Sequence, residues 1–288
     1  MAKLLMMRGI PGSGKTTRAK EIMTEAGNMV RVNRDQLRPM LHGDAKWSGK
    51  KEKVTRHVQS AMVKDLLEND YSVVVDDTNL RSADRLRWVR IATECGARFE
   101  VVDMDTPFEE CVERDYFRGD GVGAHVVASM ALSSGRFPYR NIILCDIDGT
   151  IADLRHRLHY VKDGNRDWGS FFAAVEQDGF RQDVWDRVVA DAAENDAVII
   201  FLSGRSDVCR HDTEQWLMEN CHAYIDYPIA LMRRDRDRRP DTEVKKEIFE
   251  RHFGEYNVVR VYDDRPRLVS MWREMGLDVV DCGDGIEF

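Results

Sequence analysis

The chain of 288 residues is long enough for two domains, since a domain typically has about 100–200 residues. Apolar residues make up 43% and charged residues 33% of the sequence, which is typical of a globular protein and excludes a disordered chain. The formal net charge of −8 argues against a generally basic nucleic-acid binder, so any anionic partner must be bound by local positive charge.

The first residues, MAKLLMMRGI, contain a short apolar run that leads directly into a glycine-rich loop. We therefore expect a buried strand at this end of the chain and not a leader peptide. No stretch reaches the roughly 18 apolar residues that span a bilayer. The six cysteines lack the spacing of metal ligands or of a C-x-x-C pair. We expect a cytoplasmic protein with reduced thiols and no membrane partner.

In the first half, short apolar runs alternate with longer amphipathic segments, which predicts a parallel sheet with helices on both faces. The expected strands are 4–7, 29–32, 71–75 and 99–102. The expected helices lie near 15–26, 50–69, 82–95, 107–117 and 123–132.

The alternation stops at SSGRFPYR (133–140), where serine, glycine and proline cluster, and then starts again. We expect a linker there, between an α/β domain at 1–135 and a second α/β domain at 140–288. The second set of expected strands is 141–146, 197–202, 228–232, 257–262 and 277–281. The helices that go with them lie near 182–195, 206–219, 241–253 and 265–275.

GIPGSGKT, at 9–16, matches the pattern G-x-x-x-x-G-K-[ST] through Gly9, Gly14, Lys15 and Thr16. It lies between a predicted strand and a predicted helix, which is the context that the pattern requires. Backbone N–H groups of such a loop bind phosphate at a helix N-terminus. We expect Lys15 to reach the β- and γ-phosphates of a nucleotide and Thr16 to bind Mg²⁺.

Three later segments carry charge near this loop. In VNRDQLR, Asp35 and Arg38 lie three residues apart on one helical face, so they could accept a hydroxyl proton and hold a phosphate. VVDDTNL (74–80) places carboxylates and a hydroxyl at a strand end. In ERDYFRG, Arg114 and Arg118 are four apart on one face and could clamp phosphates as a lid. Ordinary solvated helix charges remain the alternative for these segments.

The second half carries a different motif, CDIDGT, after an apolar run. Asp146 and Asp148 alternate at a strand end, so their side chains fall on one side, and Gly149 allows a sharp turn. One carboxylate could attack phosphorus while the other moves a proton. D-x-D-G-T is typical of haloacid-dehalogenase-type phosphatases. The further polar groups that such a phosphatase needs follow at later strand ends or helix starts. They are Ser203, Lys245, Asp263 and Asp264.

Taken in order and at these spacings, the motifs of the whole chain resemble those of the phage polynucleotide kinase-phosphatase family. The resemblance implies that Asp35 is the general base, that Arg38 holds the acceptor phosphate, and that Asp77 and Thr78 form a substrate-binding DTN element. It implies that Lys15 and Arg118 are catalytic. The residues implied to bind ATP are Gly9, Gly12, Gly14, Lys15, Thr16, Thr17, Arg114 and Arg118.

For the second half, the resemblance implies that Asp146 is a nucleophile that becomes an aspartyl-phosphate, and that Asp148 is the general acid–base. Mg²⁺ is then expected between Asp146, the Asp148 carbonyl, Asp263 and Asp264, with Thr16 holding the ion of the kinase. The further matched positions are Arg157, Ser203, Arg205, Arg233, Asp241 and Lys245, of which Lys245 is expected to be catalytic.

Some segments have no assigned role. Residues 151–180 are expected to form a small insert over the phosphatase site. The run RRDRDRR (233–239) is either a solvated face or an edge that contacts nucleic-acid phosphates. The segment 42–50 matches the family loosely, and Phe117 stands where the family has a basic residue before the lid arginine.

The resemblance thus implies an end-healing enzyme. Its kinase would phosphorylate 5′-hydroxyl ends of RNA or DNA with ATP, and its phosphatase would remove 3′-phosphates and 2′,3′-cyclic phosphates, so that a ligase can join the products. The alternatives are a nucleoside or metabolite kinase fused to a small-molecule phosphatase, and a nucleotide-sensing adaptor without turnover. The sequence leaves open the preference for RNA or DNA and the oligomeric state, although a homo-oligomer would fit the family.

Overall fold

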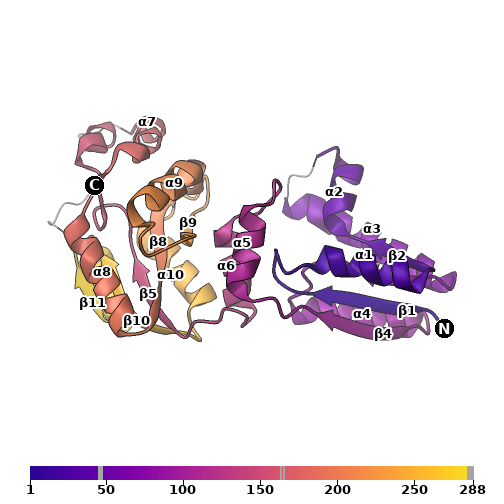
Figure 1. Ribbon diagram of the computed structural model, residues 1–288. Coiled ribbons are helices and arrows are strands. Elements are labelled where there is room, and N and C mark those ends of the chain that lie inside the picture. The colour runs from indigo at the N-terminus through magenta and orange to yellow at the C-terminus, as the bar shows by residue number, and fades with distance from the viewer. Residues whose placement is uncertain (45–47, 163, 165, 284–288) are drawn as a thin grey trace. The chain divides into compact units, whose positions relative to one another are not determined.

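The computed structural model describes residues 1–44, 48–162, 164 and 166–283. The chain divides into two compact units, Met1–Gly123 and Ala124–Phe288, and each contains its own parallel sheet flanked by helices (Figure 1). The predicted α/β class with two parallel sheets is confirmed. Helix α6 (Ala124–Ser133) packs on elements of the second unit. The domain limits 1–135 and 140–288 stay a prediction.

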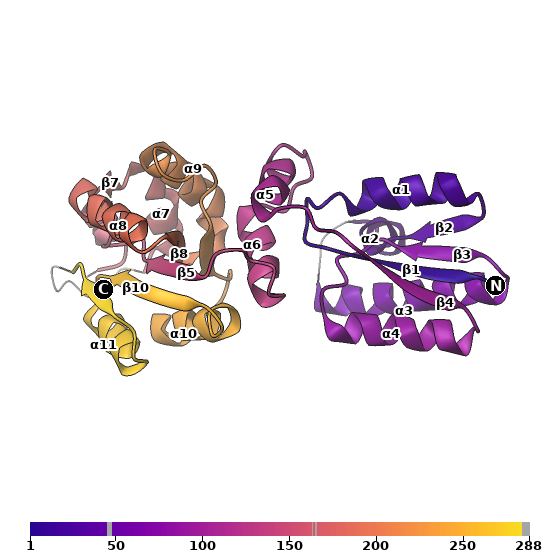
Figure 2. The same ribbon diagram turned by 60° about the horizontal axis from the view of Figure 1, so that its bottom comes forward.

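The first unit has a four-stranded parallel sheet of order β2-β3-β1-β4. Helix α1 covers one face of this sheet, and α3 and α4 cover the other (Figure 2). Its strands are β1 (Lys3–Arg8), β2 (Met29–Val32), β3 (Ser72–Val75) and β4 (Arg98–Asp103). Its helices are α1 (Lys15–Ala26), α2 (Arg34–His42), α3 (Gly49–Glu68), α4 (Ser82–Glu94) and α5 (Phe108–Tyr116).

Continuous apolar runs form the central strands of this sheet. All residues from Leu4 to Met7 in β1, and from Val73 to Val75 in β3, are buried. Both faces of a parallel sheet are covered by helices, so a central strand needs apolar side chains at every position. The carboxyl ends of β1 and β3 therefore lie side by side, and the motifs that follow them meet at one edge.

The second unit has a five-stranded parallel sheet of order β11-β10-β5-β8-β9. Its strands are β5 (Asn141–Cys145), β8 (Ala197–Ser206), β9 (Ala230–Arg233), β10 (Asn257–Asp263) and β11 (Val279–Asp281). Helices α8 and α9 pack on one face and α10 and α11 on the other (Figure 2). These helices are α8 (Gln182–Glu194), α9 (Arg210–Cys221), α10 (Asp241–His252) and α11 (Pro266–Glu274).

The segment 151–180 forms the small insert that the sequence predicts. A short antiparallel pair, β6 (Ala152–Asp153) and β7 (Gly179–Phe180), joins it to the sheet domain. Between these strands lie two 3₁₀ turns, Arg155–Tyr160 and Val175–Gln177, and helix α7 (Trp168–Ala173). We call this segment the cap. Leu154, Leu158 and Phe171 form its own buried apolar cluster.

One difference from the expected elements lies at the end of β8, in the five-stranded sheet. A helix was expected from 206, but β8 continues to Ser206, a 3₁₀ turn covers Asp207–Cys209, and α9 begins at Arg210. The extension arises because Ser206 pairs with Arg233 of β9 after a register shift. It keeps Arg205 extended and buried under the cap.

Two further findings concern the whole described chain. Among the described residues, no helix combines the length and apolar character that crossing a membrane requires. All six cysteines are free thiols, five of them buried.

Asn79 ties the ends of two strands together, and this contact yields a stability prediction. Its Nδ2 donates to the Met7 carbonyl at 2.8 Å, its Oδ1 accepts from Trp88 Nε1 at 3.2 Å, and its φ is 44°. Asn79→Ala leaves two buried polar groups unpaired and strains the backbone, so we expect a loss of about 2–4 kcal/mol. Hydrogen-exchange mass spectrometry of β1 peptides measures it. The exposed Asn69→Ala is the control, and equal exchange in both variants would contradict the prediction.

Candidate active sites

The glycine-rich loop connects β1 to α1. Gly14 precedes the helix with φ 83°, and Gly12 has φ 79°, a backbone region that favours glycine. Lys15 opens the helix, and its Nζ donates to the Ile10 carbonyl at 2.7 Å. Burial lowers the pKa of Lys15. Among the described residues, no carboxylate lies within ion-pair distance of Lys15 to offset this effect. The loop thus presents a desolvated cation that lacks an anion.

Thr16 contacts a carboxylate that the sequence analysis did not single out. Its Oγ1 donates to Asp76 Oδ2 at 2.8 Å, and Arg31 Nε also donates to this oxygen at 2.7 Å. Asp76 directly follows β3, the neighbour of β1 in the sheet. The hydroxyl and the carboxylate supply oxygen ligands of the kind that Mg²⁺ prefers. The signal in the sequence was the pair Asp76–Asp77, but spacing could not tell which one faces the loop.

Asp77 faces Arg34 of α2 and Gln59 of α3. Arg34 Nε lies 3.1 Å from Asp77 Oδ2, which also accepts from Gln59 Nε2 at 2.6 Å. The carbonyl of Thr78 accepts from the backbone N–H of Gly9 at 3.1 Å, so this residue supports the loop through its backbone. Asp77 and Thr78 therefore lie on opposite sides of the strand end.

Asp35 and Arg38 share one face of α2, as the spacing predicts. Arg38 Nη1 donates to Asp35 Oδ1 at 3.0 Å, and its Nη2 donates to Glu52 Oε2 at 3.0 Å. The Asp35 side chain is 81% exposed, so its carboxylate is open to a substrate hydroxyl. Burial alone would raise the pKa of Glu52, but hydrogen bonds and charge from Arg38 and Arg34 lower it. Glu52, which the sequence analysis missed, orients both arginines.

Helix α5 lies against the phosphate loop. A Cβ atom on Gly12 would overlap the Cys111 carbonyl oxygen, so this close approach requires glycine. Arg114 Nη1 lies 3.5 Å from the corresponding position on Gly14. Arg118 pairs with Asp115 at 3.4 Å, and its charge lowers the pKa of Lys15. Both predicted lid arginines therefore lie near the loop.

In the second unit, Asp146 and Asp148 follow β5 and are both buried. Lys245 of α10 places its Nζ 3.0 Å from Asp146 Oδ1 and 2.8 Å from Asp263 Oδ2. Gly149 has φ 79°, and a Cβ atom there would overlap Asp264 Oδ2. Glycine is thus required for the turn and for the approach of Asp264. The structure brings these predicted residues together.

Three of these carboxylates could hold a cation. Oxygens of Asp146, Asp263 and Asp264 all lie within 4.8 Å of one another. Burial raises the pKa of Asp264 to about 7, with further increase from Asp263, and it raises that of Asp146 although Lys245 opposes this. Asp264 Oδ1 is buried and accepts no hydrogen bond from the described residues. The three carboxylates repel one another and offer oxygen ligands, and Asp264 Oδ1 has a lone pair without a hydrogen bond. These properties fit a divalent ion such as Mg²⁺.

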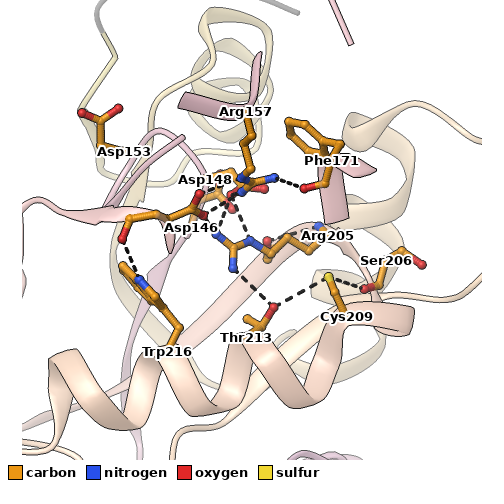
Figure 3. A network of polar contacts seen from close by, with 12 residues as sticks. Asp146, Asp148, Asp153, Arg157, Phe171, Arg205, Ser206, Cys209, Thr213 and Trp216 are labelled. Atoms are coloured by element: carbon orange, nitrogen blue, oxygen red, sulfur yellow. Dashed lines mark hydrogen bonds and ion pairs between the residues drawn. The ribbon is translucent and has the colours of Figure 1, made fainter. Parts of the chain in front are cut away.

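Asp148 belongs to a separate buried network that reaches into the cap (Figure 3). Arg157 Nη2 and Arg205 Nη2 lie 2.6 Å and 2.7 Å from Asp148 Oδ1. Asp178 binds the same arginines at 2.6 Å and 2.5 Å. Burial would raise the pKa of Asp148, but the charges of Arg205 and Arg157 outweigh it and hold the pKa far below its ordinary value.

Asp178 was missed by the sequence analysis. It is buried, accepts from His156 Nε2 at 2.9 Å when this nitrogen is protonated, and its carbonyl accepts from Trp216 Nε1 at 2.9 Å. The Asp178 carboxylate therefore neutralises two buried arginines, and its backbone carbonyl attaches the cap to α9. A single acidic residue before a short strand carries no motif, so no pattern could have identified it.

The remaining predicted residues lie near the ends of β8 and β9 and at the start of α10. Ser203 is buried, and its Oγ accepts from the Arg205 backbone N–H at 3.2 Å. Asp241 binds both Arg233 and Arg265. Arg233 also donates to the Gly204 carbonyl at 2.9 Å, so it supports the strand end.

Two predicted features are largely exposed, although Arg233, the first residue of the run 233–239, supports the strand end as described above. Thr17 is exposed in the first turn of α1. In the run 233–239, Arg239 pairs with Asp237, while Arg236 is solvated and pairs with Asp235. Residues 45–47 of the segment 42–50 lie outside the described residues.

Comparison with known proteins gives two family matches. Residues 140–286 match the family described as polynucleotide kinase PNKP phosphatase domain, and residues 4–133 match an AAA domain. The chain is also similar to a putative bifunctional polynucleotide kinase/RNA ligase of Autographa californica nuclear polyhedrosis virus, with 32% identity over 99% of this chain and 43% of the relative. The chain thus spans less than half the length of that relative.

Other relatives match one or both halves. An L-seryl-tRNA(Sec) kinase of Methanococcus maripaludis is 28% identical over 44% of this chain and 50% of its own length. A solved structure of the Pnkp1/Rnl/Hen1 RNA repair complex contains a chain that is 31% identical, with coverage of 98% of this chain and 97% of that chain and a TM-score of 0.41. Because the phosphatase-domain family matches half of the chain, at residues 140–286, this chain belongs to the polynucleotide kinase-phosphatase family.

Proposed function

We propose that this chain heals broken nucleic-acid ends, with a kinase that phosphorylates 5′-hydroxyl ends and a phosphatase that removes 3′-phosphates and opens 2′,3′-cyclic phosphates. The observation that carries the proposal is the presence of two phosphate sites. One is a glycine-rich loop whose lysine, Lys15, makes no ion pair with a described carboxylate. The other is a buried aspartate cluster whose lysine, Lys245, pairs with Asp146 and Asp263. RNA ends are the favoured substrate, because the names of two relatives refer to RNA ligation and RNA repair. A cytoplasmic location is part of the proposal.

In the kinase, Asp35 accepts the proton of the 5′-hydroxyl, and Arg38 holds the adjacent acceptor phosphate. Lys15 and the lid arginines Arg114 and Arg118 neutralise the charge that develops on the γ-phosphate of ATP as it is transferred. The exposure of Asp35 and its contact with Arg38 support these roles. Thr16 and Asp76 would hold Mg²⁺, which supplies charge neutralisation for the nucleotide.

In the phosphatase, Asp146 attacks the phosphorus and Asp148 gives a proton to the departing 3′-oxygen. Asp148 then takes a proton from the water that hydrolyses the aspartyl-phosphate, which returns Asp146 and releases phosphate. Lys245 orients Asp146. Asp263 and Asp264, together with Asp146, would hold Mg²⁺, which supplies positive charge for the phosphoryl group.

One assay tests the function as a whole. A 5′-hydroxyl, 3′-phosphate RNA oligonucleotide is incubated with the protein, ATP and Mg²⁺, and both ends are followed by mass. We expect one phosphate to be gained at the 5′ end and one to be lost at the 3′ end. The matching mononucleotide is tested in parallel, and turnover of the mononucleotide alone would move the assignment to a metabolite enzyme.

Matched substitutions should separate the two activities. Asp35→Asn removes the general base and should lower kinase activity by about 10²-fold or more while the phosphatase persists. Asp146→Asn removes the nucleophile and should lower phosphatase activity by about 10³-fold or more while the kinase persists. Exposed Asp65→Asn and Asp183→Asn are the controls for each unit. Loss of both activities in either single variant would refute the two-site assignment.

The aspartate cluster gives a prediction about metal and stability at pH 7.5. Mg²⁺ at 100 times its dissociation constant stabilises a folded site by about 2.7 kcal/mol, or roughly 5–10 °C in Tm for a unit of this size. Asp264→Asn removes one of three mutually repelling carboxylates, so it should raise the Tm in EDTA and reduce the Mg²⁺-dependent increase. Calorimetry of both proteins measures this. A lower Tm in EDTA, or an undiminished response to Mg²⁺, would contradict the assignment.

A further inference from the structure

The cap exposes a large aromatic side chain beside an otherwise buried aromatic group. Trp168 is 47% exposed, whereas its neighbour Phe171 is 2% exposed. The indole of Trp168 stacks on Phe172 with 5.9 Å between ring centroids and 30° between planes, and it meets the edge of Phe171 at 5.6 Å. An exposed aromatic surface at the rim of a polar site is typical of a binding surface.

The position of Trp168 is fixed by the structure around it. Asp167 precedes helix α7, and its Oδ1 accepts from the Ser170 backbone N–H at 3.0 Å. The Asp167 backbone N–H donates to the Tyr160 carbonyl at 3.0 Å. Two ring contacts hold the indole itself, and two hydrogen bonds hold the preceding residue, Asp167. A ligand that stacks on the indole would therefore meet a preorganised surface.

A short series of contacts connects Trp168 to the proposed acid–base. The Phe171 ring, which Trp168 touches, lies 4.1 Å from the Arg157 guanidinium carbon. Arg157 Nη2 in turn lies 2.6 Å from Asp148 Oδ1. Trp168 is thus separated from the reacting carboxylate by one aromatic ring and one arginine side chain. This series of contacts places Trp168 on the cap segment that also supplies Arg157 to the site.

We propose that Trp168 stacks against the nucleobase of the 3′-terminal nucleotide during phosphatase turnover. This inference rests on the proposed function and specifies the substrate of the same site as a base-bearing polynucleotide end. Every base has an aromatic face, so stacking accepts all of them without reading sequence. The exposed indole face carries no charge of its own, which favours a base over a backbone phosphate as its partner.

Two substrates test the proposal with the full-length protein. One is a 3′-phosphate oligonucleotide with a normal terminal base, and the other carries an abasic residue at that end with the same 3′-phosphate. The measured quantity is the ratio of their kcat/KM values. We expect the wild-type ratio to be roughly 10 to 100 in favour of the base, as loss of one stacked base implies. Trp168→Ala should bring the ratio to about 1, and Trp168→Phe should retain most of it.

A control variant distinguishes base stacking by Trp168 from a structural role of its side chain. Tyr224→Ala removes another exposed aromatic ring of the same unit, one that contacts Trp185, and should keep the wild-type ratio. If Trp168→Ala weakens both substrates equally, Trp168 has a structural role in the cap and the proposal is wrong. If the ratio is unchanged in Trp168→Ala, the indole serves another partner, such as a protein, and the proposal is again wrong. Wild-type protein that hydrolyses neither oligonucleotide would instead refute the proposed function.

Discussion

The ammonium group of Lys245 is the interaction on which the second site depends. It lies between Asp146 and Asp263, and both carboxylates are buried. A buried carboxylate without a partner is strongly destabilising, and it takes up a proton in preference to remaining charged. Those two contacts outweigh the effect of burial and raise the pKa of Lys245. Lys245 therefore offsets part of the effect of burial on Asp146, the proposed nucleophile, whose pKa still lies above its ordinary value. Asp264 has no such lysine contact and is left as an oxygen ligand for a metal ion.

The cap is linked to this chemistry through the ring of Asp148, Arg157, Asp178 and Arg205. In the free protein, two arginines hold Asp148 as a carboxylate, which suits the step in which it accepts a proton from water. The proposed preceding step needs a protonated Asp148. A phosphate dianion that bound the same guanidinium groups would weaken their hold on Asp148 and raise its pKa toward the value that a general acid needs. In the proposed mechanism, the arginines would thus link the protonation of Asp148 to substrate binding.

Motifs at strand ends were predictable from the sequence, because a few consecutive residues determine the backbone geometry of a glycine-rich loop or a D-x-D turn. Lys15, Asp146 and Asp148 needed no knowledge of tertiary contacts. Asp76 and Asp77 show the limit of this reasoning, since adjacent residues point to different neighbours and only the packing of β3 beside β1 decides which one meets Thr16.

Glu52 and Asp178 could not be predicted for a related reason. Each is an isolated acidic residue in a helix or loop, and its importance comes from the arginines that the fold brings to it. The apolar runs that form the strands of each sheet can be recognised in the local sequence. The residues that orient a catalytic group are brought to it only by the fold of the chain.

The two lysines that are buried among the described residues have opposite pKa shifts, and the difference follows from their counterions. Lys15 donates to a backbone carbonyl, so burial dominates and its pKa falls. Its missing partner is an anion, which the phosphates of a nucleotide provide, and nucleotide binding should therefore be favoured by the charge it neutralises. Lys245 is already neutralised by two aspartates, so it attracts a further anion weakly. A phosphate can enter the second site against Asp146, Asp263 and Asp264 when a divalent cation offsets their charge. The same side chain thus favours direct phosphate binding in one unit, whereas the phosphate binding proposed for the other unit would need a divalent cation.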